Sequence, residues 1–171
     1  VSYVRSSDSG KTWSRPKTLV DTHRNEQPTA IAQLPNGTVL CALFVPYADT
    51  ASTWLCASKD NGRTWSKPWK VQGRPGFENV CAYDLLPLPS GEVLMSVSGT
   101  DYSERQGDRN IFARGAVFRS RDNGKTWPEM SILGPYGPGV TPPDLGSSVW
   151  EAAIERLRDG RLICHTRSSL R

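Results

Sequence analysis

Ser6-Ser7-Asp8-Ser9-Gly10-Lys11-Thr12-Trp13 is the stretch that decides the fold, because the chain contains its pattern three times. Residues 58–65 (SKDNGRTW) and residues 120–127 (SRDNGKTW) repeat the order Ser-x-Asp-x-Gly-x-Thr-Trp. The three copies lie 52 and 62 positions apart. Repeats with periods of this size indicate an array of similar structural units.

Each residue type in these eight-residue repeats suits a tight turn. The Asp carboxylate accepts hydrogen bonds from backbone amides two residues further on. The Gly permits a positive φ, and the Trp covers the turn with apolar surface and offers one N–H. We therefore interpret nine residues of the repeats as structural and not catalytic: Asp8, Gly10, Trp13, Asp60, Gly62, Trp65, Asp122, Gly124 and Trp127.

A second turn accompanies the eight-residue repeat, at residues 34–37 (LPNG), 88–91 (LPSG) and 157–160 (LRDG). Short apolar runs on both sides of it predict β-hairpins. Each unit then consists of four successive strands, with this turn between the first and second and the eight-residue repeat between the third and fourth. Both turns lie on one face of such a unit, so the remaining connections lie on the opposite face.

The composition agrees with many short strands, since the chain has 15 glycines, 13 prolines and six tryptophans. We predict an all-β fold, a β-propeller of four-stranded antiparallel blades. Residues 1–171 would form about three blades of a single domain that is incomplete at both ends, because closed propellers have about 4–8 blades.

Several other classes of protein are disfavoured. The formal net charge is +4, but the basic residues are scattered and form no patch for nucleic acid. No run of about 18 apolar residues could span a membrane. None of the cysteines forms a CxxC pair, and we expect neither a metal nor a cofactor. Cys41 and Cys164 fall at the same position of the repeat, which indicates core packing, and Cys41 and Cys56 could lie on neighbouring strands, so a disulfide and buried thiols both stay open. The state of Cys81 is open as well.

The eight-residue repeats resemble the Asp boxes of sialidases (neuraminidases) and related BNR-repeat propellers, which are usually six-bladed. Residues 150–168, WEAAIERLRDGRLICHTRS, resemble the bacterial sialidase pattern E-x-x-x-x-x-L-x-D-G-x-L-x-x-x-x-R. The resemblance implies that Glu151 is the base that activates a nucleophilic tyrosine. It also implies that Arg167 is one of three arginines that hold the carboxylate of the substrate.

The resemblance further implies an exo-α-sialidase-like glycoside hydrolase that removes sialic acid or a related acidic sugar from glycans. The acid/base aspartate, the tyrosine and two arginines would lie outside residues 1–171, so we expect this chain alone to be inactive. The same resemblance suggests a secreted, periplasmic or cell-surface protein.

The predicted hairpin supports the pair independently. Folding it about Asp159 brings Glu151 opposite Arg167, at the end of the strands away from the turn. The corresponding pairs of the other two hairpins, Pro28/Phe44 and Ala82/Ser98, carry no charge. A guanidinium binds a carboxylate through two parallel hydrogen bonds, and sialidases use a tyrosine nucleophile. The alternative is a cross-strand ion pair with a structural role.

Weaker candidates lie in loops on the same predicted face. Asp49 follows the second strand of its unit, but Gln27 stands where the resemblance to sialidases implies a companion arginine. The long polar loop 99–110 contains Asp101, and it either lines the cleft or forms ordinary surface. Residues 134–139 could shape the rim of the pocket, whereas His23 and His165 match no metal or catalytic pattern.

Two other functions remain open at this point. A non-catalytic propeller of the same repeats could bind glycans or proteins. A propeller hydrolase of another type, such as a glucanase, would use two carboxylates in place of the tyrosine.

Overall fold

The computed structural model describes the chain except for residues 22–24, 47–50, 102–111, 134–148 and 169–171. In the described ranges the regular elements are strands, and none is a helix of the length and apolarity needed to cross a membrane. The strands are β1 (Ser2–Tyr3), β2 (Lys17–Thr18), β3 (Gln27–Gln33), β4 (Val39–Val45), β5 (Ser52–Ser58), β6 (Trp69–Lys70), β7 (Phe77–Pro87), β8 (Val93–Asp101), β9 (Phe112–Ser120), β10 (Glu129–Ile132), β11 (Val149–Arg156) and β12 (Leu162–Ser168).

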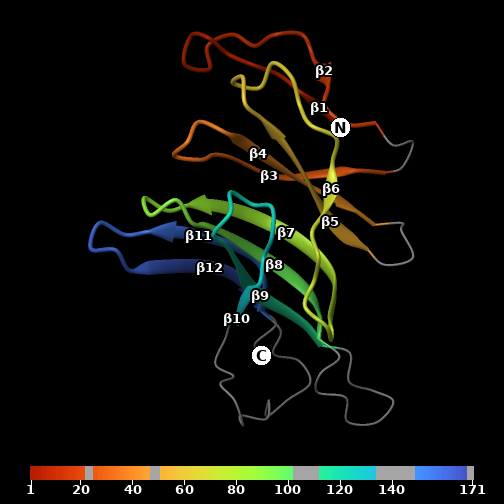
Figure 1. Cartoon of the computed structure of the whole chain (residues 1–171), viewed down its shortest axis with the longest axis vertical. Helices are drawn as coiled ribbons and strands as arrows, with labels where there is room; N and C mark the ends of the chain where they lie inside the picture. The colour runs from red at the N-terminus through yellow and green to blue at the C-terminus, as the bar shows by residue number, and fades with distance from the viewer. Residues whose placement is uncertain (22–24, 47–50, 102–111, 134–148, 169–171) are drawn as a thin grey trace.

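The strands form two full sheets and two short hairpins (Figure 1). The first full sheet has the order β3-β4-β5-β6 and the second β7-β8-β9-β10, and neighbouring strands are antiparallel. β1 pairs with β2, and β11 pairs with β12. This up-and-down order confirms the predicted four-stranded units with both kinds of turn in the expected places.

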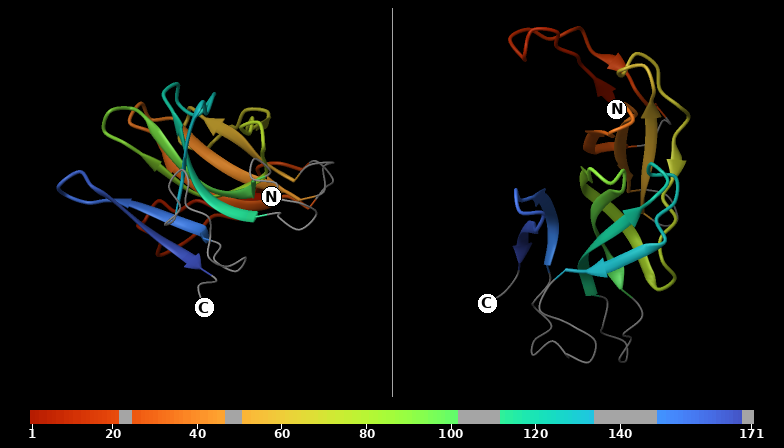
Figure 2. Two further views of the ribbon diagram at one scale, coloured as in Figure 1. Left: turned by 90° about the horizontal axis from the view of Figure 1, so that it is seen from below. Right: turned by 60° about the vertical axis from the view of Figure 1, so that its left-hand side comes forward.

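Successive units pack against one another through apolar faces, and Figure 2 shows them arranged one after another along the molecule. Leu40 and Leu55 of the first full sheet and Val97 and Phe118 of the second are buried in one core. β11 lies against the second full sheet. Gly115 permits this approach, because a Cβ there would lie 2.7 Å from the carbonyl oxygen of Val149.

The eight-residue repeats close in the same way in all three copies. In the first copy, the Asp8 carboxylate accepts hydrogen bonds from the amide of Thr12 (2.9 Å), from its hydroxyl (2.6 Å) and from the Ser6 hydroxyl (2.7 Å). The Ser6 hydroxyl also accepts from the amide of Gly10, at 2.9 Å. The corresponding bonds from the threonine hydroxyl measure 2.6 Å in the second copy and 2.7 Å in the third.

One detail of these turns differs from our expectation. In all three copies the carboxylate binds the amide four residues further on, and in the second and third copies it also binds the amide three residues on, in place of the expected amide two residues on. The reason is a left-handed backbone at two consecutive positions, Ser9 (φ 59°) and Gly10 (φ 85°), which curls the chain back over the aspartate. Asn61 and Asn123 take the place of Ser9 in the other copies, with φ of 57° and 60°.

The tryptophans of the repeats differ in burial. Trp127 is only 9% exposed and donates its N–H to the carbonyl of Gly124, whereas Trp13 is 62% exposed. The third repeat packs on the first full sheet so closely that a Cβ on Gly124 would lie 2.6 Å from the Leu40 side chain. The predicted covering role is therefore clear for Trp127, while Trp13 remains at the surface.

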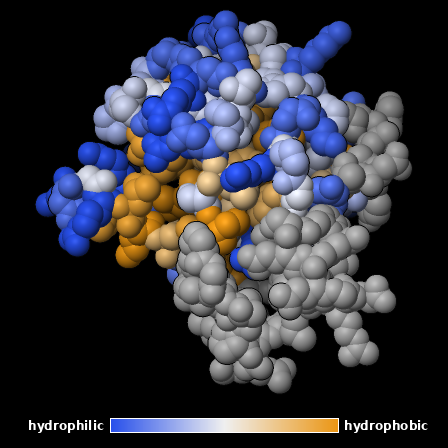
Figure 3. Space-filling model, turned by 60° about the horizontal axis from the view of Figure 1, so that its bottom comes forward, coloured by the Kyte–Doolittle hydropathy of each residue, from blue (hydrophilic) through white to orange (hydrophobic). Residues whose placement is uncertain are grey.

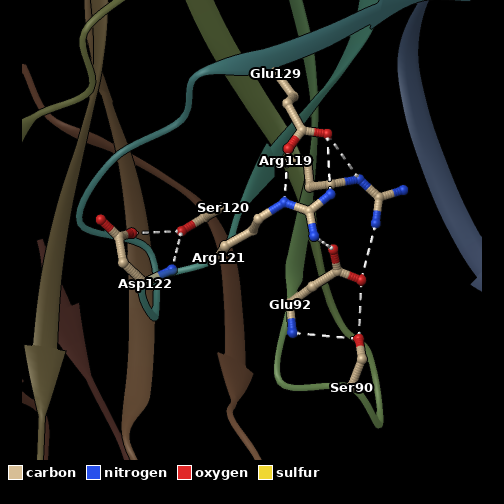
Figure 4. Close-up of polar contacts among 7 residues, drawn as sticks. All are labelled: Ser90, Glu92, Arg119, Ser120, Arg121, Asp122 and Glu129. Carbon is tan, nitrogen blue, oxygen red and sulfur yellow. Dashed lines mark hydrogen bonds and ion pairs between the residues drawn. The ribbon is translucent and has the colours of Figure 1, made fainter.

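Charged side chains link the strands of the second full sheet at the end that carries the third eight-residue repeat (Figure 4). Arg121 pairs with Glu92 at 2.8 Å and with Glu129 at 2.7 Å. Arg119 pairs with the same two carboxylates, at 3.1 Å and 3.7 Å. This network links β9 and β10 to the residue before β8, next to the third repeat.

All four cysteines are free thiols. Cys41 and Cys56 lie directly opposite each other on β4 and β5, as the sequence allowed, and both are buried. The Cys56 thiol donates to the carbonyl of Cys41 at 3.8 Å. These two cysteines therefore act as core residues in this structure.

Candidate active site

Glu151 and Arg167 form an ion pair at the ends of β11 and β12 that lie away from the turn at residues 157–160. Arg167 Nε lies 3.1 Å from Glu151 Oε2. Their side chains are 39% and 60% exposed, respectively, so both are accessible to a ligand. The predicted proximity of the two residues is thus confirmed. Exposed ion pairs contribute about 0–1 kcal/mol to stability, so folding alone gives little reason for this one.

The register around the pair differs from the prediction. Ile154 faces Cys164 as expected, but the register shifts between Trp150 and Ala153, and Trp150 becomes the partner of Arg167. A β-bulge causes the shift, because an extra residue on one strand bends it and redirects its side chains. Glu151 therefore reaches Arg167 from inside a bulge and not from a regular cross-strand position.

The bulge recurs in the first strand of each unit. β3 shifts register between Pro28 and Ala30, and β7 shifts between Ala82 and Asp84. The predicted partners in those hairpins were consequently one residue out of register, and the observed pairs are Pro28↔Leu43 and Ala82↔Val97. Because the three hairpins share the bulge, their backbones are similar at this strand end. They differ in the side chains that they carry there.

Glu151 has an unusual backbone conformation, with φ of 54°. A left-handed conformation in a residue other than glycine costs about 1–3 kcal/mol and is concentrated at functional sites. Among the described residues, the other non-glycine residues with positive φ are serine or asparagine: Ser9, Asn61, Asn79 and Asn123. Glu151 is the one long charged side chain in this group.

The ring of Trp150 also contacts the guanidinium of Arg167. The Arg167 Cζ lies 4.9 Å from the centroid of the Trp150 ring, within the range of a cation–π interaction. The guanidinium is therefore oriented by both the indole and the Glu151 carboxylate. The sequence motif included Trp150, but nothing in its pattern indicated this contact, since the pairing of Trp150 with Arg167 follows from the bulge.

The neighbouring sheet fixes the position of β11 through three side chains. Ser98 Oγ accepts a hydrogen bond from the amide of Glu151 at 3.1 Å. Ser96 Oγ donates to the carbonyl of Ala152, and Asp84 Oδ2 accepts from the amide of Ile154 at 2.9 Å. These bonds satisfy backbone groups on the edge of β11 that faces away from β12. None of these three contacts could be predicted from the sequence, because the side chains come from another unit of the fold.

A tyrosine and a thiol lie beside Glu151. Burial raises the pKa of Tyr83 to about 12, with further contributions from Cys81 and from the negative charge of Glu151, while a hydrogen bond with Ser98 opposes the shift. Burial also raises the pKa of Cys81, which interacts with both Tyr83 and Glu151. Both groups are therefore protonated at neutral pH, next to an exposed carboxylate.

The other candidates are placed less fully. Asp49, His23 and residues 134–139 lie outside the described residues, as does most of the loop that follows Asp101. Asp101 ends β8, where its backbone pairs with Phe77 and Phe112, and its side chain lies outside the described part. His165 is exposed on β12. No group of three or more His, Cys, Asp or Glu side chains in the described ranges could hold a metal ion.

These features define an all-β protein of repeated antiparallel sheets with an exposed Glu–Arg pair at one strand end. The chain belongs to the BNR repeat-like domain family, whose model matches residues 1–164. No curated protein matches the sequence.

Two solved structures with a similar fold are glycoside hydrolases. The Hadza microbial sialidase Hz136 aligns with 96% of this chain at a TM-score of 0.72 and 18% sequence identity. The α-L-arabinanase of Penicillium chrysogenum, solved with arabinobiose, aligns with 87% of the chain at a TM-score of 0.56 and 23% identity. The chain spans 35% of the length of that sialidase and 42% of that arabinanase.

Proposed function

We propose that the protein is a glycoside hydrolase of the exo-sialidase type, which removes a terminal sialic acid or a related acidic sugar from glycans. The observation that carries this proposal is the Glu151–Arg167 pair, with its 3.1 Å separation and its contact with Trp150. The pair occupies a strand end that the other two hairpins also present, yet Pro28 and Ala82 stand where this hairpin has Glu151. Membership of the BNR repeat-like family and the fold of a sialidase support the same class.

The arrangement suits recognition of a sugar carboxylate by Arg167. Its ion pair with Glu151 uses Nε, so a ligand can be received by the edge formed by the two terminal nitrogens. A guanidinium binds a carboxylate through two parallel N–H···O bonds, which a lysine cannot reproduce. Trp150 would keep the plane of the guanidinium fixed while the ligand binds.

Glu151 is suited to act as a base. Its carboxylate is exposed and already lies beside the guanidinium of Arg167. Sialidases use a tyrosine nucleophile in place of a carboxylate, and such a nucleophile needs a group that takes its proton. We assign that role to Glu151, as the sequence resemblance implies.

We further propose that the sheets are blades of a β-propeller. Leu40 and Leu94, at corresponding positions of the two full sheets, are 0% and 1% exposed, whereas Ile163 of the β11–β12 hairpin is 55% exposed. Large apolar side chains are rarely left open over a wide area, and Figure 3 shows a contiguous apolar area, in orange, on one face of the molecule. A further strand or blade packed on β12 would cover Ile163.

The test is hydrolysis of a fluorogenic α-sialoside by the full-length protein and by two variants, Glu151→Gln and Arg167→Lys. We expect activity in the wild type and a loss of about 10²–10⁴-fold in Glu151→Gln, the range for removal of a catalytic base. Arg167→Lys should mainly raise KM. The matched control is Arg161→Lys, since Arg161 pairs with Asp159 at 2.7 Å at the opposite end of the same hairpin.

Of two contrary outcomes, the first would overturn the proposed function and the second would overturn the assignment of the site. The first is an inactive, folded wild-type protein, and cleavage of an arabino-oligosaccharide in the same assay would then point to another hydrolase. The second is a wild-type level of sialidase activity in both variants, which would leave the Glu151–Arg167 pair as a structural contact.

A further inference from the structure

The backbone of Glu151 is held in its left-handed conformation from outside its own hairpin. Its amide donates to Ser98 Oγ, at 3.1 Å, and Ser98 belongs to β8 of the neighbouring sheet. The bond joins residues 53 positions apart, across the packing between two units. A strained conformation persists only where the surroundings determine it, so the contact with Ser98 bears directly on where the Glu151 side chain points.

The position of Ser98 gives it little freedom. The residue is 9% exposed, and its hydroxyl also interacts with Tyr83 on β7. Register places Ser98 opposite Cys81 and Gly115, so both neighbouring strands enclose it. The corresponding residue of the first full sheet is Phe44, which has no hydroxyl to offer. The contact is therefore specific to the sheet that packs against the Glu151 strand.

Ser96 and Asp84 also hold β11, but they bind residues other than Glu151. Ser96 binds the carbonyl of Ala152, and Asp84 binds the amide of Ile154. Both fix β11 against the second full sheet, yet neither contacts the backbone of Glu151. The three contacts thus separate into two that attach the strand and one that sets the conformation at the bulge.

We propose that Ser98 is a positioning residue for Glu151. It holds the Glu151 amide, keeps the bulge in its left-handed form and so directs the carboxylate toward Arg167 and the reacting atoms. The kinetic part of this inference rests on the proposed sialidase function, whereas the structural part does not. A misplacement of about 1 Å can lower the rate of an enzyme about 100-fold, so the role has a measurable consequence.

The first test compares Ser98→Ala, Ser98→Thr and Ser96→Ala in the full-length protein on the fluorogenic sialoside. We expect Ser98→Ala to lower kcat about 10- to 100-fold with little change in KM, because Arg167 still binds the substrate. Ser98→Thr keeps the hydroxyl and should restore much of kcat. Ser96→Ala is the matched control, and it should leave kcat near the wild-type value even if it lowers stability.

The second test does not depend on activity. Hydrogen exchange at single-residue resolution should show the Glu151 amide of Ser98→Ala exchanging roughly tenfold faster, as expected for the loss of one hydrogen bond. The Ile154 amide, held by Asp84, should keep its rate. An inactive wild type would reject the proposed function alone, since the exchange rates still decide whether Ser98 fixes Glu151. An unchanged Glu151 amide, or an equal loss of kcat in both alanine variants, would overturn the positioning role.

Discussion

The residues at one end of the strands repeat from unit to unit, whereas those at the other end differ. At the end with the eight-residue repeats, three copies of one sequence make the same bonds, with threonine hydroxyl to aspartate distances of 2.6, 2.6 and 2.7 Å. At the opposite end, all three hairpins share a β-bulge, but only β11 and β12 add a carboxylate and a guanidinium to it. Repeated residues thus build the units, and a unique pair placed on repeated geometry marks the candidate site.

Charge illustrates the same contrast. Near the third repeat, Arg119 and Arg121 are paired with Glu92 and Glu129, and each arginine contacts both carboxylates. At the other end, in the part of the chain that the structure describes, Arg167 pairs with the Glu151 carboxylate and contacts the ring of Trp150. The first arrangement satisfies its charges within one sheet. The second arrangement engages the Nε of Arg167, and the proposed function assigns its two terminal nitrogens to an anionic ligand.

The largest expected effect separates catalysis from stability. Glu151→Gln should reduce kcat/KM by about 10²–10⁴-fold while the free energy of unfolding changes by no more than about 0.5 kcal/mol, as for most surface substitutions. Asp60→Asn in the second repeat should do the reverse, because the Asp60 carboxylate accepts four hydrogen bonds in the turn and an amide offers one acceptor oxygen in place of two. Kinetics and denaturant unfolding on both variants measure the two effects. A large stability loss in Glu151→Gln would remove the distinction between the two ends.

A second prediction concerns differences among the repeats themselves. Trp127→Ala should destabilise the protein by about 3–5 kcal/mol, the range for deletion of a buried tryptophan. Trp13→Ala should change the free energy of unfolding by no more than about 0.5 kcal/mol, because Trp13 is 62% exposed. Urea titration of both variants provides the measurement. Equal effects would show that the repeats contribute alike, whatever their packing.

Acid should destabilise the protein through the aspartates of the eight-residue repeats. Hydrogen bonds from Thr12 and Ser6 lower the pKa of Asp8 to about 2, and hydrogen bonds from Thr64 and Ser58 lower the pKa of Asp60. Carboxyls with lowered pKa values stabilise the folded state above pH about 4, and this contribution is lost as the pH falls toward 2. We expect the midpoint of urea unfolding to drop over that interval, and to drop less in Asp8→Asn. Unfolding curves that are flat between pH 4 and about 2 would contradict the assignment.

The smallest expected effect lies near the candidate site at high pH. Burial raises the pKa of Tyr83 to about 12, so the folded state favours its protonated form. The associated stability is present below pH about 10, the ordinary value for tyrosine, and is lost as the pH rises toward 12. Absorbance of tyrosinate in the wild type and in Tyr83→Phe should show one late-titrating group missing from the variant. If the group missing from the variant titrates at the ordinary value of about 10 instead, the shift is rejected.

Much of the fold could be predicted from the sequence, because the information is local and repeated. The turns at residues 34–37 and 88–91 and the eight-residue repeats mark the boundaries of the strands, and the short apolar runs between them mark the strands themselves. The proximity of Glu151 and Arg167 followed from the same hairpin geometry. Counting residues from the turn was sufficient to bring the two side chains to one strand end.

The remaining features depend on contacts between units. A β-bulge leaves no mark in a pattern of apolar residues, so the pairing of Trp150 with Arg167 was not visible. Ser98 is far from Glu151 in sequence, and its role appears only when the second full sheet packs against β11. The burial of Trp127, compared with the exposure of Trp13, likewise reflects which surface each repeat meets.

Calorimetric binding of N-acetylneuraminic acid and of its methyl ester to the full-length protein would show whether Arg167 recognises a carboxylate. We expect the wild type to bind the acid about 10- to 100-fold more tightly than the ester, since the ester lacks the charge-assisted hydrogen bonds. Arg167→Lys should lose most of this preference, and Arg161→Lys should keep it. Equal affinity of the wild type for the acid and the ester would contradict the claim.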